Sequence, residues 1–141
     1  MKKLLLVLCF LLCAGKSWAD VLLINNGLNQ QKSLHQYEIQ AIFMLRRLYW
    51  NDGTNITPIF LPSDSPLHIK FVNEVLKVSP YNFNIVINNK IQNGEAPHAM
   101  VVDNVSAAIS LVKHNIGAIA YMYDFNAILI DPSITVVRII E

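Results

Sequence analysis

Hydrophobic and polar positions along the chain follow two periods, one typical of strands and the other of helices. Short apolar runs between turn residues predict strands at 20–24, 55–61, 99–104, 117–123 and 134–141. Apolar residues spaced three and four apart predict amphipathic helices at 34–49, 66–78 and 104–114. Because strands and helices alternate, the pattern predicts an α/β fold of two or three layers.

Residues typical of helix starts and turns set the expected boundaries of these helices. Ser33 is the expected N-cap of the helix at 34–49, which should end at the turn Asn51-Asp52-Gly53. Ser65 is the expected N-cap of the next helix, with Pro66 at its first position. Either Asp103 or Asn104 should cap the helix at 104–114.

Three segments have features that require separate interpretation. Residues 81–92 are Asn-rich, and we interpret them as a helix, although "FNIVI" within them also fits a strand. Residues 99–104, "AMVVDN", fit a buried strand. Pro58 places its strand at a sheet edge, or itself at a strand end, since proline cannot donate a backbone hydrogen bond.

The N-terminal segment 1–19 has the pattern of a secretory signal peptide. Two lysines precede an apolar run from Leu4 to Ala14, and small residues at Ser17 and Ala19 predict cleavage after Ala19. Leu12 stands before Cys13 where a lipoprotein signal requires a small residue, which argues against a lipid anchor. Both cysteines lie in this segment, so we expect one disulfide-free exported domain at 20–141.

Charge argues against a nucleic-acid partner. The whole chain has a net charge of +1, but the predicted signal removes Lys2, Lys3 and Lys16 and leaves an excess of acidic residues. The pair Arg46-Arg47 is the one place where basic residues are adjacent in the exported part, and it fits one face of a solvated helix. Phosphate backbones require clustered Lys and Arg.

Several motifs in the same order resemble periplasmic phosphate-binding proteins of ABC transporters, especially short, single-lobe chains similar to them. The segment 33–53, "SLHQYEIQAIFMLRRLYWNDG", resembles the family's first helix with the Trp and Asp-Gly turn that follow it. Further along stand "TPIF", "SPLHIKF", "GEAP" at 94–97 and "GAIAY" at 117–121. No single motif is specific, but their order extends over nearly the whole exported part.

The resemblance implies a single lobe of a periplasmic-binding-protein type II-like fold, a mixed sheet flanked by helices. Full-length relatives have two lobes with the ligand between them, and the first lobe has no counterpart in this sequence. The implied function is an exported, periplasmic solute-binding-like protein for phosphate or a related oxyanion, bound weakly. The implied partners are ABC transporter or sensor membrane subunits, with self-association as a further possibility. Trp50 is expected to be a packing residue.

The expected ligand-binding residues are Ser63, Asp64 and Ser65, which precede the helix that begins at Pro66. The free N–H groups and the dipole of a helix start favour an anion. An alternative is that Ser65 is only an N-cap. Asp64 would repel an anion unless it accepts a phosphate proton, a role that an aspartate has in the resembled family, and Pro66 removes one N–H donor.

Other chemistries have little support in the sequence. The histidines at 35, 68, 98 and 114 lack metal-ligand spacing, and we expect no metal and no cofactor. Nucleophile-elbow and Walker motifs are absent, so an enzyme is not expected. Two hypotheses remain: a solute-binding-like protein, or a single-lobe interaction or sensory accessory protein that has lost ligand transport.

Overall fold

The structure, a computed structural model, describes residues 20–124 and 132–141, so the predicted signal at 1–19 and both cysteines lie outside the described residues. In the described part, one mixed sheet has the strand order β2-β6-β1-β5-β3-β4. The strands are β1 (Val21–Asn26), β2 (Ser33–His35), β3 (Thr57–Phe60), β4 (Met100–Val101), β5 (Ala118–Tyr123) and β6 (Ile134–Ile140). The helices are α2 (Gln36–Phe43), α3 (Pro66–Lys70), the π-helix η1 (Phe71–Leu76), α4 (Pro80–Gln92) and α5 (Val105–His114).

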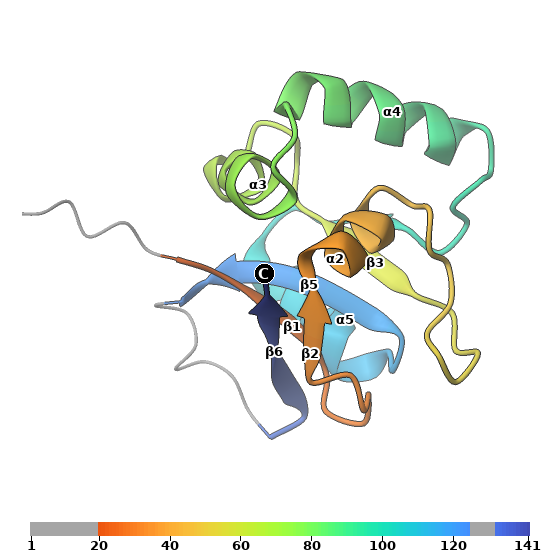
Figure 1. Cartoon of the computed structure of the whole chain (residues 1–141), viewed down its shortest axis with the longest axis vertical. Helices are drawn as coiled ribbons and strands as arrows, with labels where there is room; N and C mark the ends of the chain where they lie inside the picture. The colour runs from red at the N-terminus through yellow and green to blue at the C-terminus, as the bar shows by residue number, and fades with distance from the viewer. Residues whose placement is uncertain (1–19, 125–131) are drawn as a thin grey trace, which may run out of the picture.

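Helices cover both faces of the sheet, which confirms the α/β class and gives it three layers (Figure 1). The alternation of β5 shows how. Ile119 and Tyr121 point into a core with α2, α3, η1 and α4, whereas Ala118, Ala120 and Met122 point into a second core with α5. A strand in the middle of such a sheet is buried on both faces, and its sequence is accordingly apolar throughout.

Strand directions determine which loops meet. β3 runs parallel to both β4 and β5, whereas β1 runs antiparallel to β5 and to β6. The carboxyl ends of β3, β4 and β5 therefore lie at the same edge of the sheet. The chain segments that follow these three strands converge there.

The predicted helix at 34–49 is wrong at both ends. Leu34 belongs to β2, and the helix begins after His35, whose N–H donates to Glu38 Oε2 at 2.8 Å. The helix ends at Phe43, because Leu45 adopts a left-handed conformation with φ 59°. The N–H groups of Arg46 and Arg47 both return to the Ala41 carbonyl. Leu45 is only 4% exposed, so its burial fixes a conformation that leucine rarely adopts.

The predicted turn at Asn51-Asp52-Gly53 is confirmed. Gly53 has φ 87°, which favours glycine, and its N–H donates to the Trp50 carbonyl at 2.9 Å. The Trp50 side chain is buried, and its Nε1 donates to the Gly117 carbonyl at 3.0 Å. Trp50 therefore joins this corner to the start of β5, as expected of a packing residue.

Two of the three separate interpretations, those of residues 81–92 and of Pro58, are confirmed. Residues 81–92 are helical as part of α4, and Pro58 lies near the beginning of β3. Thr57 N–H donates to Gly117 O, so Thr57 faces β5 and the next residue, Pro58, faces the β4 side. The pairing with β4 begins only at Ile59, so no hydrogen bond from position 58 is needed there. The buried strand predicted at 99–104 is wrong. It is reduced to β4 at the sheet edge, where Met100 and Val101 are exposed.

Candidate functional site

A crevice lies at the carboxyl ends of β3, β4 and β5, between the starts of α3 and α5. It has a volume of about 300 Å³ and is lined by Leu61, Ser65, Pro66, Leu67, Asp103, Asn104, Val105 and Tyr123. In α/β sheets, ligands commonly bind outside the carboxyl ends of the strands. We call this hollow the crevice.

The first helix start in the crevice is that of α3. Ser65 and Pro66 are its N-cap and first residue, as predicted, and the helix continues through η1 to Leu76. The Ser65 N–H donates to the Pro62 carbonyl at 2.9 Å, and the Ser65 carbonyl accepts from Ile69 N–H at 3.0 Å. The Ser65 hydroxyl makes no capping hydrogen bond. Its role as a cap therefore comes from its backbone, and its side chain is not committed to the helix.

The second helix start is that of α5. Asn104 is its N-cap, and its side chain accepts a hydrogen bond from Ala107 N–H at 2.9 Å. This decides between the two predicted caps, since Asp103 lies one position earlier with an exposed side chain. Two helix starts thus face the same hollow, and each contributes the partial positive charge of a helix N-terminus.

The three predicted ligand residues do not lie in one place. Ser65 lines the crevice, whereas Ser63 lines a separate hollow of about 160 Å³ beside His68, Phe83 and Asn84. Asp64 is exposed and lines neither of these two hollows. The loop that carries all three is short, so Ser63 and Asp64 lie next to Ser65 in the chain but outside the described lining of the crevice.

A buried hydrogen-bond chain, which we call the His68 chain, holds this loop in place. The Tyr121 hydroxyl on β5 accepts a hydrogen bond from Leu61 N–H at 2.9 Å, and it also lies 2.7 Å from His68 Nδ1. His68 Nε2 lies 3.3 Å from Asn84 Oδ1 on α4. The chain therefore ties the end of β3 to α3, α4 and β5 beneath the Ser63–Ser65 loop.

The donors and acceptors of this chain are consistent with a neutral imidazole. Burial lowers the pKa of His68, and the hydrogen bond to Asn84 opposes this only in part. Since Asn84 Oδ1 can only accept, His68 carries its proton on Nε2, and its Nδ1 accepts from the Tyr121 hydroxyl. Burial also raises the pKa of Tyr121, against the opposing effect of the hydrogen bond from Leu61. Both groups are uncharged near neutral pH.

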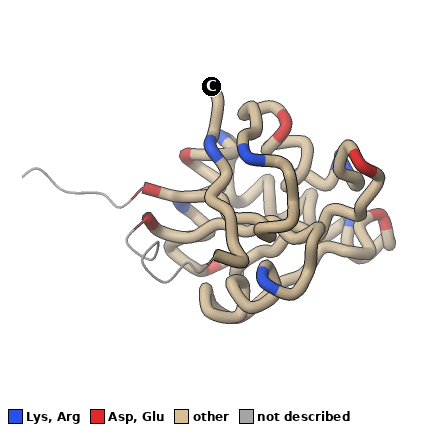
Figure 2. Tube along the Cα trace, turned by 90° about the horizontal axis from the view of Figure 1, so that it is seen from below, with Lys and Arg blue, Asp and Glu red and all other residues tan. Residues whose placement is uncertain are grey.

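Positive side chains do not surround the crevice. Among its described lining residues there is no Lys or Arg, and Asp103 contributes a carboxylate. Figure 2 shows basic and acidic residues scattered along the trace, without one large area of either sign. An anion in the crevice would thus depend on N–H groups, hydroxyls and helix dipoles.

Two further observations concern the described residues alone. Within 20–124 and 132–141, no group of three or more His, Cys, Asp and Glu side chains is arranged to hold a metal ion. None of the helices in that part combines the length and the hydropathy that a membrane span requires.

Solved structures of phosphate-binding proteins share this fold. They include an ABC-type phosphate transport receptor from Vibrio cholerae (TM-score 0.66, 17% identity, 86% of this chain and 46% of that chain). A putative phosphate ABC transporter substrate-binding protein with bound phosphate from Clostridium perfringens is similar (TM-score 0.66, 19% identity, 86% and 45%). So is PstS from Borrelia burgdorferi (TM-score 0.67, 14% identity, 86% and 47%).

These likenesses establish the fold. The chain has the architecture of a single lobe of the phosphate-binding proteins, and it spans less than half the length of each of these three chains. No family model matches the sequence. No curated protein matches it either.

The crevice contains residues that sequence reasoning did not assign to a site. Asp103 and Asn104 were considered only as helix caps, and Tyr123 only as part of a strand. Each follows the carboxyl end of a strand or ends one, which is the signal that could have found them. Using that signal requires knowing that β3, β4 and β5 are parallel neighbours, which no local pattern reveals.

Proposed function

We propose that this chain is an exported, periplasmic solute-binding-like protein that binds phosphate or a related oxyanion in the crevice, in association with ABC-type transport. The observation that carries the proposal is the meeting of two helix starts, at Ser65 and Asn104, outside the carboxyl ends of three parallel strands. Helix N-termini bind anions through free N–H groups and the dipole. The phosphate-binding proteins that share the fold support the choice of ligand.

In this proposal, the Ser65 hydroxyl donates to the anion together with backbone N–H groups of the first turn of α3. Pro66 has no N–H, so the first such donor within the helix is that of Leu67. Ser63 and Asp64 would have to reach the anion from the same loop, outside the crevice lining, and Asp64 would have to accept a proton from the phosphate to avoid repulsion. The carboxylate of Asp103 weakens the binding further, and the proposed role is binding without catalysis.

The second candidate function is that of an interaction or sensory accessory protein that keeps the lobe fold without transporting a ligand. One observation favours it: the crevice lining lacks a basic residue in the described part. Its partners would be transporter or sensor membrane subunits. The two functions differ in whether the crevice binds an anion.

Calorimetric titration of the protein with phosphate separates these functions, and the chain supplies a matched control. Ser79-Pro80 begins α4 just as Ser65-Pro66 begins α3, with φ and ψ of −67° and 127° against −63° and 128°, and neither serine side chain makes a capping bond. If the proposal is right, Ser65→Ala weakens phosphate binding by about tenfold, the value of one charged hydrogen bond, and Ser79→Ala does not. Equal effects of the two variants would remove Ser65 from the site, and no heat at millimolar phosphate would favour the interaction protein.

A further inference from the structure

The sheet is interrupted between β1 and β6. These strands pair antiparallel from Asn26↔Ile134 as far as Leu23↔Val137. Beyond that point β6 pairs with β2 instead, through Ser33↔Arg138 to His35↔Ile140, while β1 stays paired with β5 as far as Val21↔Tyr123. The two strands therefore separate, and a hollow of about 560 Å³ opens between them. We call it the slot.

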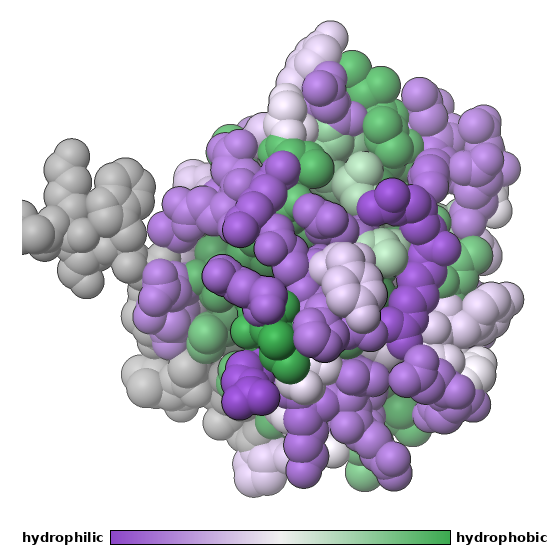
Figure 3. Space-filling model, viewed as in Figure 1, coloured by the Kyte–Doolittle hydropathy of each residue, from purple (hydrophilic) through white to green (hydrophobic). Residues whose placement is uncertain are grey.

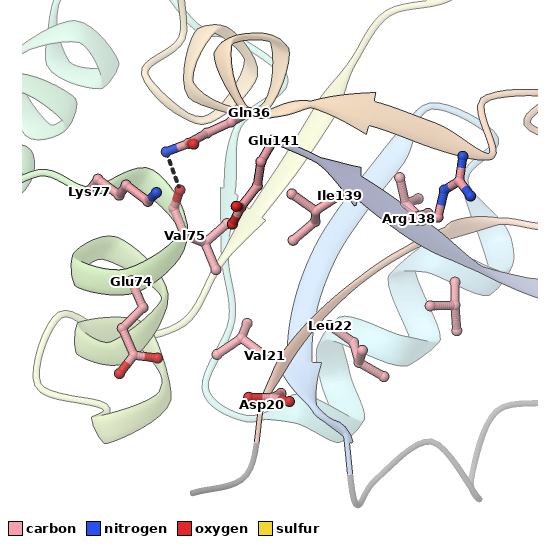
Figure 4. A pocket seen from close by; sticks show the side chains of 12 residues that line it. Asp20, Val21, Leu22, Gln36, Glu74, Val75, Lys77, Arg138, Ile139 and Glu141 are labelled. Atoms are coloured by element: carbon pink, nitrogen blue, oxygen red, sulfur yellow. Dashed lines mark hydrogen bonds between the residues drawn. The ribbon is translucent and has the colours of Figure 1, made fainter.

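The slot has an apolar inner side. Figure 4 shows Val21 from β1 and Ile139 from β6 on its two flanks, with Val75 of η1 on the side of the helix. All three pack, partly buried, against the larger core. The Gln36 side chain donates to the Val75 carbonyl at 3.4 Å and so joins α2 to η1 on this side. In Figure 3, hydrophobic surface is visible in the region of β1 and β6.

Three backbone hydrogen bonds set the direction of the peptide groups along the slot. Asp124 N–H donates to Asp20 O at 2.8 Å, so Asp20 faces β5 and Val21, the next residue, faces away from β5. Arg138 N–H donates to Lys32 O at 2.9 Å, so Arg138 faces β2 and Ile139 faces β1. Gly27 N–H donates to Ser133 O at 2.7 Å, so odd-numbered residues of β1 and β6 face each other, in agreement with the other two bonds.

Val21 and Ile139 thus direct their N–H and C=O groups into the slot from opposite sides. In the β1–β6 register they would be the next hydrogen-bonded pair after Leu23↔Val137, but the pairing has ended there. Within the described part of the chain, no other backbone pairs with these groups. Unpaired strand edges of this kind are templates for another strand.

We propose that the slot binds an extended polypeptide segment of another protein, inserted as a strand between β1 and β6. A peptide backbone is the complementary ligand, because it presents N–H and C=O groups along both of its edges. The rim carries Asp20 and Glu141 against Lys77 and Arg138, while Glu74 pairs with Lys70 at 3.4 Å. Since these charges balance, the slot fits an uncharged segment with apolar side chains toward Val21 and Ile139.

A strand inserted into the slot must be free on both edges. Each strand in the described part of this chain already pairs on at least one edge, so none of these strands in a folded second copy can fill the slot. A flexible segment of a different protein can. This inference does not depend on the proposed oxyanion site, which lies at the starts of α3 and α5.

Amide hydrogen exchange followed by NMR tests the proposal, with a capped peptide of alternating threonine and valine as the probe. In the free protein, the amides of Val21 and Ile139 should exchange quickly, while those of Leu23 and Val137 are protected. Saturating peptide should slow the exchange of the first two by about tenfold, the effect of one hydrogen bond. A peptide N-methylated at its valines lacks the donors of one edge and should bind more weakly by a similar factor.

The chain also supplies a matched pair of variants. Ile139→Pro removes the amide that faces the slot. Val101→Pro, the control, removes one on the outer edge of β4, away from the slot, since Val102 N–H donates to Phe60 O. The first should weaken binding of the peptide by about tenfold, and the second should leave it unchanged. Protection of Val21 and Ile139 without peptide, protection that rises with protein concentration alone, or equal binding of the N-methylated peptide would each overturn the proposal.

Discussion

The Tyr121 hydroxyl is the central atom of the His68 chain. It accepts from Leu61 N–H and donates to His68, so a single oxygen holds the end of β3 and the side chain of α3 together. The Tyr121 ring is stacked on Phe71, with centroids 3.9 Å apart, and is 1% exposed. A polar group buried among aromatic rings is stabilising only while its partners are in place.

Replacing Tyr121 by Phe should therefore destabilise the protein. The ring stays, but Leu61 N–H and His68 Nδ1 lose their partner inside the core. We expect a loss of about 1–3 kcal/mol in the free energy of unfolding, the usual penalty for an unsatisfied buried group, measured by urea denaturation. Tyr81→Phe, at a side chain that is 75% exposed, is the control and should change little. An equal effect of both variants would contradict the buried chain.

His68 should also make stability depend on pH. Its pKa is lowered in the folded protein, so the unfolded chain takes up the proton first as pH falls through the ordinary value of about 6.5. The contribution of neutral His68 to the free energy of unfolding is thus complete above pH of about 6.5, and it is lost as pH falls toward the lowered pKa of the folded protein. Urea denaturation at several pH values should show a smaller loss on acidification for His68→Gln than for wild type. The exposed His98→Gln should behave like wild type.

At the scale of elements, α5 is the clearest case of a pattern that determines a structure. The apolar residues of this helix, Val105, Ala108, Ile109 and Val112, recur at helical spacing, and the last three are buried against β1, β3 and β5. Ile109→Ala should cost about 2–5 kcal/mol in the free energy of unfolding, as expected for a core position. Ile116→Ala, at a residue 48% exposed, should stay within about 0.5 kcal/mol. A small effect at Ile109 would place it at the surface.

The segment 34–49 shows where periodicity fails as a guide. Leu34, Ile42 and Leu45 are all buried as the helical pattern requires, but Leu34 achieves this from a strand and Leu45 from a left-handed turn. Burial can be met by several backbone conformations, so apolar spacing fixes the buried face better than it fixes the boundaries. The predicted burial of Met100 and Val101 is wrong for a different reason, because an apolar run does not reveal that its strand will lie at the edge of the sheet.

The candidate site was predictable only in part for a similar reason. Ser65 could be found from its position before Pro66, since a cap and its helix are close in sequence. The crevice also requires Asn104 and Tyr123, which are far from Ser65 in the chain. They lie beside it because β3, β4 and β5 are parallel neighbours in the sheet. The π-helix that extends α3 and the gap between β1 and β6 likewise depend on tertiary contacts.

At the scale of the whole molecule, the crevice is only partly enclosed. The chain covers under half of the phosphate-binding proteins that share its fold, and a ligand site usually surrounds most of its ligand. An anion held from one side keeps much of its hydration, and water weakens every electrostatic contact that remains. Without a basic side chain in the described lining, the helix starts and the hydroxyl groups beside them must hold it.

We therefore expect this chain by itself to bind phosphate no more tightly than the high micromolar range. If two copies close around one anion, each contributes a crevice, and the apparent affinity rises with protein concentration because binding and association are linked. Titration calorimetry at two protein concentrations, with sedimentation to fix the oligomeric state at each, distinguishes these cases. Affinity that is weak and independent of concentration indicates a half-site, whereas affinity that rises with the dimer fraction indicates a cleft completed by a second copy. Submicromolar binding by a strict monomer would show that the argument from the open crevice is wrong.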